Sequence, residues 1–173
     1  MFLGIDPGCR GAIVILNRNG EVRRTEKMPA QKIKHRTVYD HAAISDLAEG
    51  LFWGVEFALL EEQQAFPGQG VVSMFTTGYG YGIWRQVLSL YDVRHETVKP
   101  KDWQYEFGII RRRGNTKAQA LQRAEALWPD VDLKAHRTKA GKLVGNDGLA
   151  DALLIAEYAR RKHLGGLTQH RKR

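Results

Sequence analysis

The feature that most constrains the fold is the segment FLGIDPGCRGAIVIL at residues 2–16, in which two short apolar runs flank the turn-forming PGCRG. Apolar runs of this length, bounded by Pro and Gly, are typical of β-strands joined by a tight turn, so we expect strands at 2–6 and 11–16. Residues 21–28 are polar enough for a third strand at a sheet edge. Together the three segments predict an antiparallel meander.

The rest of the chain alternates apolar runs with amphipathic segments. FALLEEQ at 57–63 suits a buried central strand, and 92–100 suits another strand that Pro100 ends. The spacing of apolar residues predicts helices at 41–53, 72–91, 116–128 and 147–163. The segments expected to be irregular are 30–40, the basic turn 111–115, the polar loop 130–146 and a disordered basic tail at 165–173. This order predicts one α/β domain at residues 1–164, with helices on the faces of a mixed sheet.

The charge balance indicates a polyanionic partner. The 173 residues include 27 Lys and Arg against 19 Asp and Glu, which gives a formal net charge of +8 and a pI near 9.7. Such a surplus favours nucleic acid over a membrane surface, and a basic surface that is merely solvated is the alternative. Cys9 is the only cysteine, which excludes an internal disulfide and favours a reducing compartment. No apolar run is long enough to cross a bilayer and no signal peptide is recognisable, so we expect a cytoplasmic, intracellular protein.

Acidic residues interrupt the apolar segments at two strand ends. Asp6 lies in the first predicted hairpin, where an unpaired buried carboxylate is unfavourable. It either caps the turn by accepting a hydrogen bond near Gly8 or binds a cation. Glu61 and Glu62 end the run FALLEEQ, where the strand either reaches solvent or supplies an acid to a site. Because adjacent strand residues face opposite sides, only one of the two can join a given cluster.

The third acidic position is a pair on the last predicted helix. Asp147 and Asp151 are four residues apart and share a helical face. The helix dipole explains an acid at the helix start but does not explain Asp151 on the apolar stripe. If the strands of Asp6 and Glu61 are parallel neighbours, both acids emerge at one sheet edge. The helix pair can lie over them, and four carboxylates would hold two Mg²⁺ or Mn²⁺ ions, the apparatus of phosphodiester hydrolysis.

Six short motifs follow one another along residues 2–160: GIDPGCRGA, LEEQQAFPGQGVVSMF, GYGYGIW, VKPKDW, TKAQA and NDGLADALLIAEYA. In this order the chain resembles RuvC-type Holliday-junction resolvases, in particular their phage and organellar relatives. The resemblance implies an RNase H-like fold, a five-stranded mixed sheet flanked by helices. It implies a homodimer that resolves four-way DNA junctions by paired symmetric nicks. The catalytic, metal-binding residues that it implies are Asp6, Glu61, Asp147 and Asp151.

Two departures from the family pattern concern these acids. The family has an acid six residues before the Pro of PGQG, which selects Glu61, but a single acid is usual there and Glu62 is an addition. The last two acids are four residues apart, as in phage-like relatives, whereas bacterial members space them three apart.

The resemblance also implies contacts to branched DNA. Lys117 in TKAQA resembles a basic residue near the scissile phosphate, where a cation would neutralise developing charge, and a solvated lysine in a first helical turn is the alternative. The residues expected to contact phosphates are Arg10, Lys99, Lys101, Arg111, Arg112, Arg113 and Lys117, together with Arg137, Lys139, Lys142 and the tail.

Two further features of the family can be placed on the sequence. An aromatic side chain stacks at the junction centre in relatives, and Phe66, Phe75 or Tyr79 could serve here, with core or loop packing as the alternative. The helix at 72–91 contains Gly78, Gly80 and Gly82, which favours a close contact. That contact is either with the sheet or with the second copy of a dimer.

Three other functions fit parts of the sequence. A non-catalytic DNA-binding module of the same fold would not need four acids. A nuclease of the same fold could act on other branched DNA or on RNA–DNA hybrids. GIDPG also resembles the phosphate loops of actin-like kinases, although those proteins are far longer and need a second domain.

Overall fold

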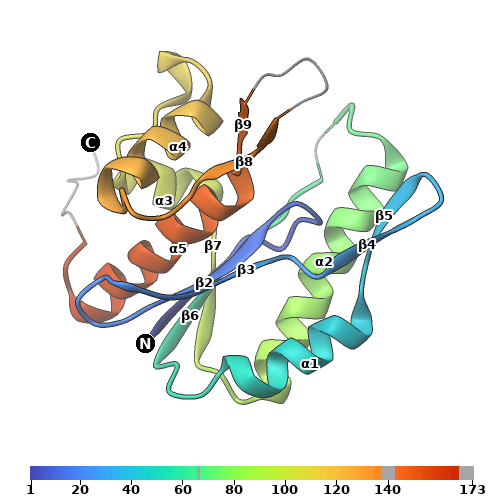
Figure 1. Ribbon diagram of the computed structural model, residues 1–173, viewed down its shortest axis with the longest axis horizontal. Helices are drawn as coiled ribbons and strands as arrows, with labels where there is room; N and C mark the ends of the chain where they lie inside the picture. The colour runs from blue at the N-terminus through green and yellow to red at the C-terminus, as the bar shows by residue number, and fades with distance from the viewer. Residues whose placement is uncertain (66, 138–142, 168–173) are drawn as a thin grey trace.

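A five-stranded mixed sheet forms the centre of the protein in the computed structural model, which describes residues 1–65, 67–137 and 143–167 (Figure 1). The strand order is β3-β2-β1-β6-β7. These strands are β1 (Phe2–Ile5), β2 (Ala12–Leu16), β3 (Val22–Lys27), β6 (Phe57–Glu61) and β7 (His95–Val98). The helices are α1 (His41–Leu51), α2 (Val71–Leu90), α3 (Pro100–Glu106), α4 (Thr116–Leu127) and α5 (Asp147–Leu164). The expected five-stranded mixed sheet flanked by helices is confirmed.

The first three strands form the predicted antiparallel meander. β1 pairs with β2 and β2 pairs with β3, both in the antiparallel sense. β1 also pairs with β6, and β6 pairs with β7, in the parallel sense. Because β1 and β6 run side by side in one direction, their carboxyl ends meet at the same edge of the sheet.

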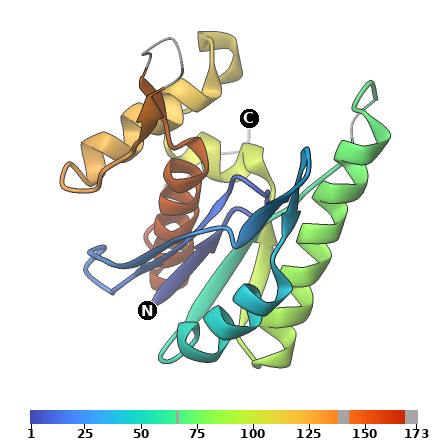
Figure 2. The same ribbon diagram turned by 45° about the vertical axis from the view of Figure 1, so that its right-hand side comes forward.

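Helices cover the two faces of the sheet unequally. In Figure 2, α5 lies on one face with α4 outside it, and α1 and α2 lie on the other face. Buried side chains form one core on each face: Phe57 and Leu59 belong to the core under α5, whereas Ala58 and Leu60 belong to the core under α1 and α2. This alternation fixes which face each residue of β6 presents.

Helix α5 is buried around most of its circumference because it lies between the sheet and α4. It approaches β1 at Gly4, where an added Cβ would come within 2.3 Å of the Ala156 nitrogen. Only glycine therefore permits this contact. None of the helices among the described residues is long and apolar enough to span a membrane.

Two segments that the sequence predicts to be irregular form hairpins instead. The segment 30–40 contains β4 (Ala30–Ile33) and β5 (Arg36–Tyr39), which pair only with each other around a turn in which Lys34 has φ +55°. The segment 130–146 contains β8 (Lys134–Arg137) and β9 (Leu143–Gly145), of which the structure describes only the backbone. Both predictions were wrong because hairpins outside the main sheet do not need an alternating apolar face.

The stretch after β7 also contains a helix that the sequence reading did not assign. The strand ends at Val98, as expected before Pro100, but this proline then opens α3 as its first residue. Proline is well suited to that position because its fixed φ is helical and its missing N–H has no partner there. The basic turn at 111–115 is a short 3₁₀ segment over Arg111–Arg113.

The glycines of α2 divide into two kinds. At Gly80 an added Cβ would come within 2.0 Å of the Tyr39 hydroxyl and 2.9 Å of the Pro7 carbonyl oxygen, so this glycine lets α2 pack against the turn that follows β1. At Gly78 and Gly82 an added Cβ would meet no described residue within 4 Å. Of these three glycines, packing among the described residues explains only Gly80.

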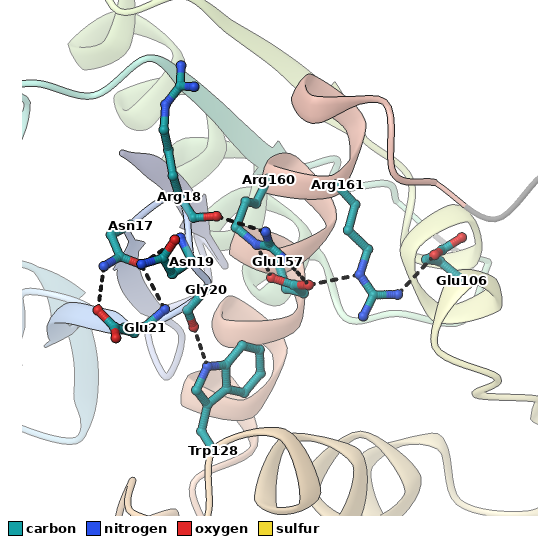
Figure 3. A network of polar contacts seen from close by, with 10 residues as sticks. All are labelled: Asn17, Arg18, Asn19, Gly20, Glu21, Glu106, Trp128, Glu157, Arg160 and Arg161. Carbon is teal, nitrogen blue, oxygen red and sulfur yellow. Dashed lines mark hydrogen bonds and ion pairs between the residues drawn. The ribbon is translucent and has the colours of Figure 1, made fainter.

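An ion-pair network holds the carboxyl-terminal end of α5 in place (Figure 3). Glu157 is buried and accepts hydrogen bonds from Arg160 and Arg161 on the same helix. Arg161 reaches Glu106 of α3 at 3.1 Å, and Arg160 donates to the Arg18 carbonyl oxygen at 2.9 Å. The network thus ties the carboxyl-terminal half of α5 to two other parts of the fold.

Candidate active site

Asp6 directly follows β1 and lies where the chain turns toward β2. Its Oδ1 accepts a hydrogen bond from the Gly8 N–H at 3.0 Å, and its own N–H donates to the Ala12 carbonyl oxygen at 3.0 Å. The expected turn-capping bond is therefore present. Gly4 and Asp6 are two residues apart in an extended chain, so Asp6 lies on the same face as α5, which packs on Gly4. The capping bond does not remove this carboxylate from the α5 side of the sheet.

Glu61 is the last residue of β6 and lies beside Asp6. The parallel register pairs Ile5 with Leu60, so the next residue of each strand is an acid at the shared edge. Glu61 Oε1 accepts a hydrogen bond from Trp103 Nε1 at 3.0 Å, and Oε2 accepts one from Gln63 Nε2 at 3.0 Å. The carboxylate is thus both buried and held in one orientation.

The two neighbouring glutamates have different surroundings. Glu61 faces the α5 side of the sheet, the side to which Leu59 also contributes. Glu62 faces the opposite way, and its Oε1 accepts an exposed hydrogen bond from Gln64. The strand geometry therefore places Glu61, and not Glu62, with Asp6.

The start of α5 is brought to these two acids by the turn after β1. Gly11 and Gly148 form a parallel bridge, and a Cβ on Gly148 would come within 2.2 Å of the Arg10 carbonyl oxygen. Asn146 caps the helix by accepting a hydrogen bond from the Leu149 N–H at 3.3 Å. Asp151 lies one turn further along, and its carboxylate interacts electrostatically with those of Glu61 and Asp6.

Lys117, the second residue of α4, is the cation of this site. Its Nζ lies 3.2 Å from Asp147 Oδ2, and the two side chains are 66% and 38% exposed. Lys117 also lowers the pKa of both Asp6 and Asp151, although less than burial raises them. The head of Lys117 is therefore solvated and lies at the acids.

The acids at this edge have strongly raised pKa values. Burial raises the pKa of Asp6 from 3.8 to about 6, against the opposing hydrogen bond from Gly8. Burial, followed by repulsion from Asp6, raises the pKa of Glu61 from 4.5 to about 8. Burial, followed by repulsion from Glu61 and Asp6, raises the pKa of Asp151 well above its ordinary value. Burial thus destabilises the ionised form of all three carboxylates, and repulsion adds to this for Glu61 and Asp151.

A bound divalent cation would reverse this repulsion. The donors are hard carboxylate oxygens, the ligands that Mg²⁺ and Mn²⁺ prefer, so the residues present fit such an ion. Among the described residues no group of three His, Cys, Asp or Glu side chains is already arranged as a metal site. The residues that would hold the ions are Asp6, Glu61, Asp147 and Asp151.

Trp103 is a residue of this site that the sequence reading did not single out. It is fully buried in α3, and its indole N–H holds Glu61. The only signal in the sequence was its place in the motif VKPKDW. Its contact with Glu61 spans 42 positions in the chain, which no local pattern predicts.

The expected DNA contacts have different positions. Arg10 is exposed in the turn after β1, Arg111–Arg113 are exposed just before α4, and Lys99 and Lys101 are exposed around the start of α3. Lys139, Lys142, Phe66 and the end of the tail at 168–173 lie outside the described residues, as does the side chain of Arg137. Phe75 is 73% exposed and Tyr79 is 46% exposed, so neither is buried in the core, which was one part of the packing alternative for them.

Sequence comparisons give no relative, whereas structural comparisons do. No protein-family model matches the chain, and no curated protein matches it significantly. Thermus thermophilus RuvC in complex with a Holliday junction substrate matches with a TM-score of 0.59 and 16% identity over 96% of this chain and 97% of that chain. T. thermophilus RuvC alone matches with a TM-score of 0.55, 17% identity and the same coverage.

A third solved structure extends the likeness beyond bacteria. The yeast mitochondrial Holliday junction resolvase matches with a TM-score of 0.50 and 14% identity, over 92% of this chain and 77% of that chain. Identities this low establish architecture and leave activity open. On this architecture, the chain has the RNase H-like fold of RuvC.

Proposed function

We propose that the protein is a metal-dependent endonuclease that resolves four-way DNA junctions by paired nicks. The observation that carries this proposal is the meeting of three carboxylates, one just after β1, one at the end of β6 and one on α5, whose pKa values are raised by burial and, for Glu61 and Asp151, also by repulsion from neighbouring acids. A protein that only binds DNA gains nothing from acids beside phosphates, whereas a metal-dependent nuclease needs them. The structural likeness to a RuvC crystallised with its junction supports the choice of substrate.

The roles of the side chains follow from their positions. Two Mg²⁺ or Mn²⁺ ions, when bound, would supply an activated water and stabilise the leaving oxygen. Asp6, Glu61, Asp147 and Asp151 present the oxygens that hold them. Trp103 keeps Glu61 oriented through its indole N–H, which is a positioning role. Lys117, which pairs with Asp147, is placed to neutralise charge that develops on a phosphate bound beside it.

We place the dimer contact of this function on α2. Gly78 and Gly82 lie on its exposed face with open space above them, so a second helix can approach the backbone closely there. A two-fold dimer presents two active sites to the two-fold symmetry of a four-way junction. Phe75, one turn before Gly78 and stacked at 6.1 Å on Tyr79, is our candidate for the aromatic at the junction centre.

The substrate is tested by competition at fixed salt. A labelled four-way junction, a linear duplex and an RNA–DNA hybrid are offered with Mg²⁺, because affinity alone mostly reports charge. We expect symmetric nicks in the junction, lost in Asp6→Asn while binding in EDTA persists. Preferred cleavage of the hybrid would favour the other nuclease function, and normal cleavage by Asp6→Asn would remove the assigned site. Mg²⁺-dependent ATP hydrolysis without DNA cleavage would favour a phosphotransferase.

The dimer contact is tested by the pair Gly78→Gln and Gly82→Gln. Each replaces a helical glycine in open space, which favours the helix by roughly 0.5–1 kcal/mol, so the monomer keeps or gains thermal stability. Light scattering should nevertheless show loss of the dimer, because the added side chains separate the two helices. A dimer that survives both substitutions would place the contact elsewhere.

A further inference from the structure

A cavity lies beside the turn that follows β1. It encloses about 310 Å³ between this turn and the β4–β5 hairpin. Its walls come from the end of β3, from both strands of the hairpin and from Asn146, which precedes α5. The lining residues used below are Arg10, Lys27, Lys32, Thr37 and Asn146.

The charges that line this cavity are all of one sign. Arg10, Lys27 and Lys32 line it, and no acidic residue does. Among the described residues none of these three cations has an ion pair, in contrast to Lys117 beside the acids. Three cations that share a cavity without a counter-charge repel one another, so an anion is the ligand that this cavity favours.

The cavity and the acids are adjacent through the backbone. Gly11 lines the cavity, and a Cβ added to it would come within 2.7 Å of the Asp6 side chain. Asn146 lines the cavity and is followed directly by Asp147. An anion in the cavity would therefore lie close to the acids, with only the turn after β1 between them.

The β4–β5 hairpin lies outside the main sheet. Its two strands pair only with each other, and most of its residues are exposed. It stands over the turn after β1, where Lys27 at the end of β3 and Lys32 in β4 both reach the cavity. A projecting hairpin of this kind can contact a ligand that extends beyond the acids.

From these observations we infer that Arg10, Lys27 and Lys32 form a binding site for a backbone phosphate of the DNA strand, adjacent to the phosphate that is cut. The inference rests on the proposed function and extends it by naming a subsite and the hairpin that builds it. The polar side chains Thr37 and Asn146, which also line the cavity, can donate hydrogen bonds to phosphate oxygens. The subsite would fix the register of the strand over the acids.

The test compares two lysines of the same hairpin. Lys32→Gln removes a cation that lines the cavity. Lys34→Gln removes a cation that does not line the cavity, and the loss of net charge is the same. Junction affinity is measured in EDTA at several KCl concentrations. We expect Lys32→Gln and Lys27→Gln each to weaken binding about fivefold at 0.15 M salt and to reduce the salt slope by about 0.9, the loss of one phosphate contact. Lys34→Gln should leave both the affinity and the salt slope close to those of the wild type.

A scan with methylphosphonates, which are neutral, locates the contact on the DNA. One modified position near the cleavage point should weaken binding of the wild type more than binding of Lys32→Gln, because that variant has already lost one of the three cations that contact this phosphate. Equal effects of Lys32→Gln and Lys34→Gln, or no position with this coupling, would overturn the subsite. If instead the wild type neither binds nor cuts the junction, the proposed function itself fails, so the two failures are distinguishable.

Discussion

The acids at the two ends of α5 have opposite surroundings and opposite pKa shifts. At the carboxyl-terminal end, the Glu157 side chain is only 6% exposed and is paired with Arg160 and Arg161. Burial alone would raise the pKa of Glu157, but the hydrogen bonds from the two arginines outweigh it and lower the pKa. At the amino-terminal end, Asp151 has no comparable cation among the described residues, and its pKa is raised.

The difference separates a structural network from a functional one. A paired buried acid stabilises the folded state relative to an unpaired one, and its geometry is complete within the chain. The acids around Asp151 lower stability and are incomplete within the chain, which is expected where a ligand supplies the missing charge. One helix therefore carries a paired acid at one end and acids that repel one another at the other.

The largest expected effect is on activity at the amino-terminal end. Glu61→Gln should reduce junction cleavage on the order of 10³-fold, or about 4 kcal/mol in activation free energy, because a metal-holding oxygen is lost. Gln keeps an oxygen that accepts the Trp103 hydrogen bond, so the fold should remain intact. Single-turnover cleavage with Mg²⁺, alongside circular dichroism, measures both. Cleavage within threefold of wild type would assign Glu61 to structure alone.

The next effect is on stability at the opposite end. Glu157→Gln leaves Arg160 and Arg161 without their carboxylate and should lower the free energy of unfolding by about 3 kcal/mol. Urea unfolding measures this loss, and cleavage per folded molecule should be unchanged. A stable Glu157→Gln variant with impaired cleavage would reverse the assignment of the two ends.

The pH dependence of stability should be smaller and should come from the amino-terminal end. The folded-state pKa values of Asp6 and Glu61, about 6 and about 8, lie above the unfolded values of 3.8 and 4.5. Between these values the folded state binds more protons, so the metal-free protein loses stability as the pH rises from about 4 to 8. Urea unfolding in EDTA should therefore show a free energy of unfolding that falls between pH 5 and pH 8. In Glu61→Gln the loss of stability above pH 6 should disappear. If stability falls with pH as steeply as in the wild type, other groups cause the loss.

The smallest effect should come from an exposed pair near the carboxyl-terminal end. Lys162 contacts Glu96 of β7, and both side chains are at least one-third exposed. Lys162→Gln should therefore lower the free energy of unfolding by at most about 0.5 kcal/mol. It is the matched control for Glu157→Gln on the same helix, and a loss as large as that of Glu157→Gln would mean that burial does not separate the pairs.

The central sheet and the acidic edge were predictable from local patterns. Alternation along 2–6 and 57–63 fixes which face each residue presents, so parallel pairing alone brings Asp6 beside Glu61. The helical spacing of Asp147 and Asp151 likewise fixes their shared face. These inferences needed only the two periodicities of regular structure.

The parts that escaped prediction depend on contacts between distant segments or on exposed backbone. The β4–β5 hairpin has no apolar alternation, because it is largely exposed. The bond from Trp103 to Glu61 and the pair of Arg161 with Glu106 join separate elements whose approach the sequence does not show. Both kinds of feature are determined by tertiary packing.

The central claim is that the acids at the amino-terminal end of α5 bind divalent cations. The effect of metal on the free energy of unfolding tests this claim most directly. The free energy of unfolding is measured in urea at pH 8, with EDTA or with 10 mM Mn²⁺, for the wild type and for Asp6→Asn. Binding to the folded state alone should raise the wild-type value by about 1 kcal/mol or more and leave Asp6→Asn nearly unchanged. An equal response of the two proteins, or none in the wild type, would contradict the account.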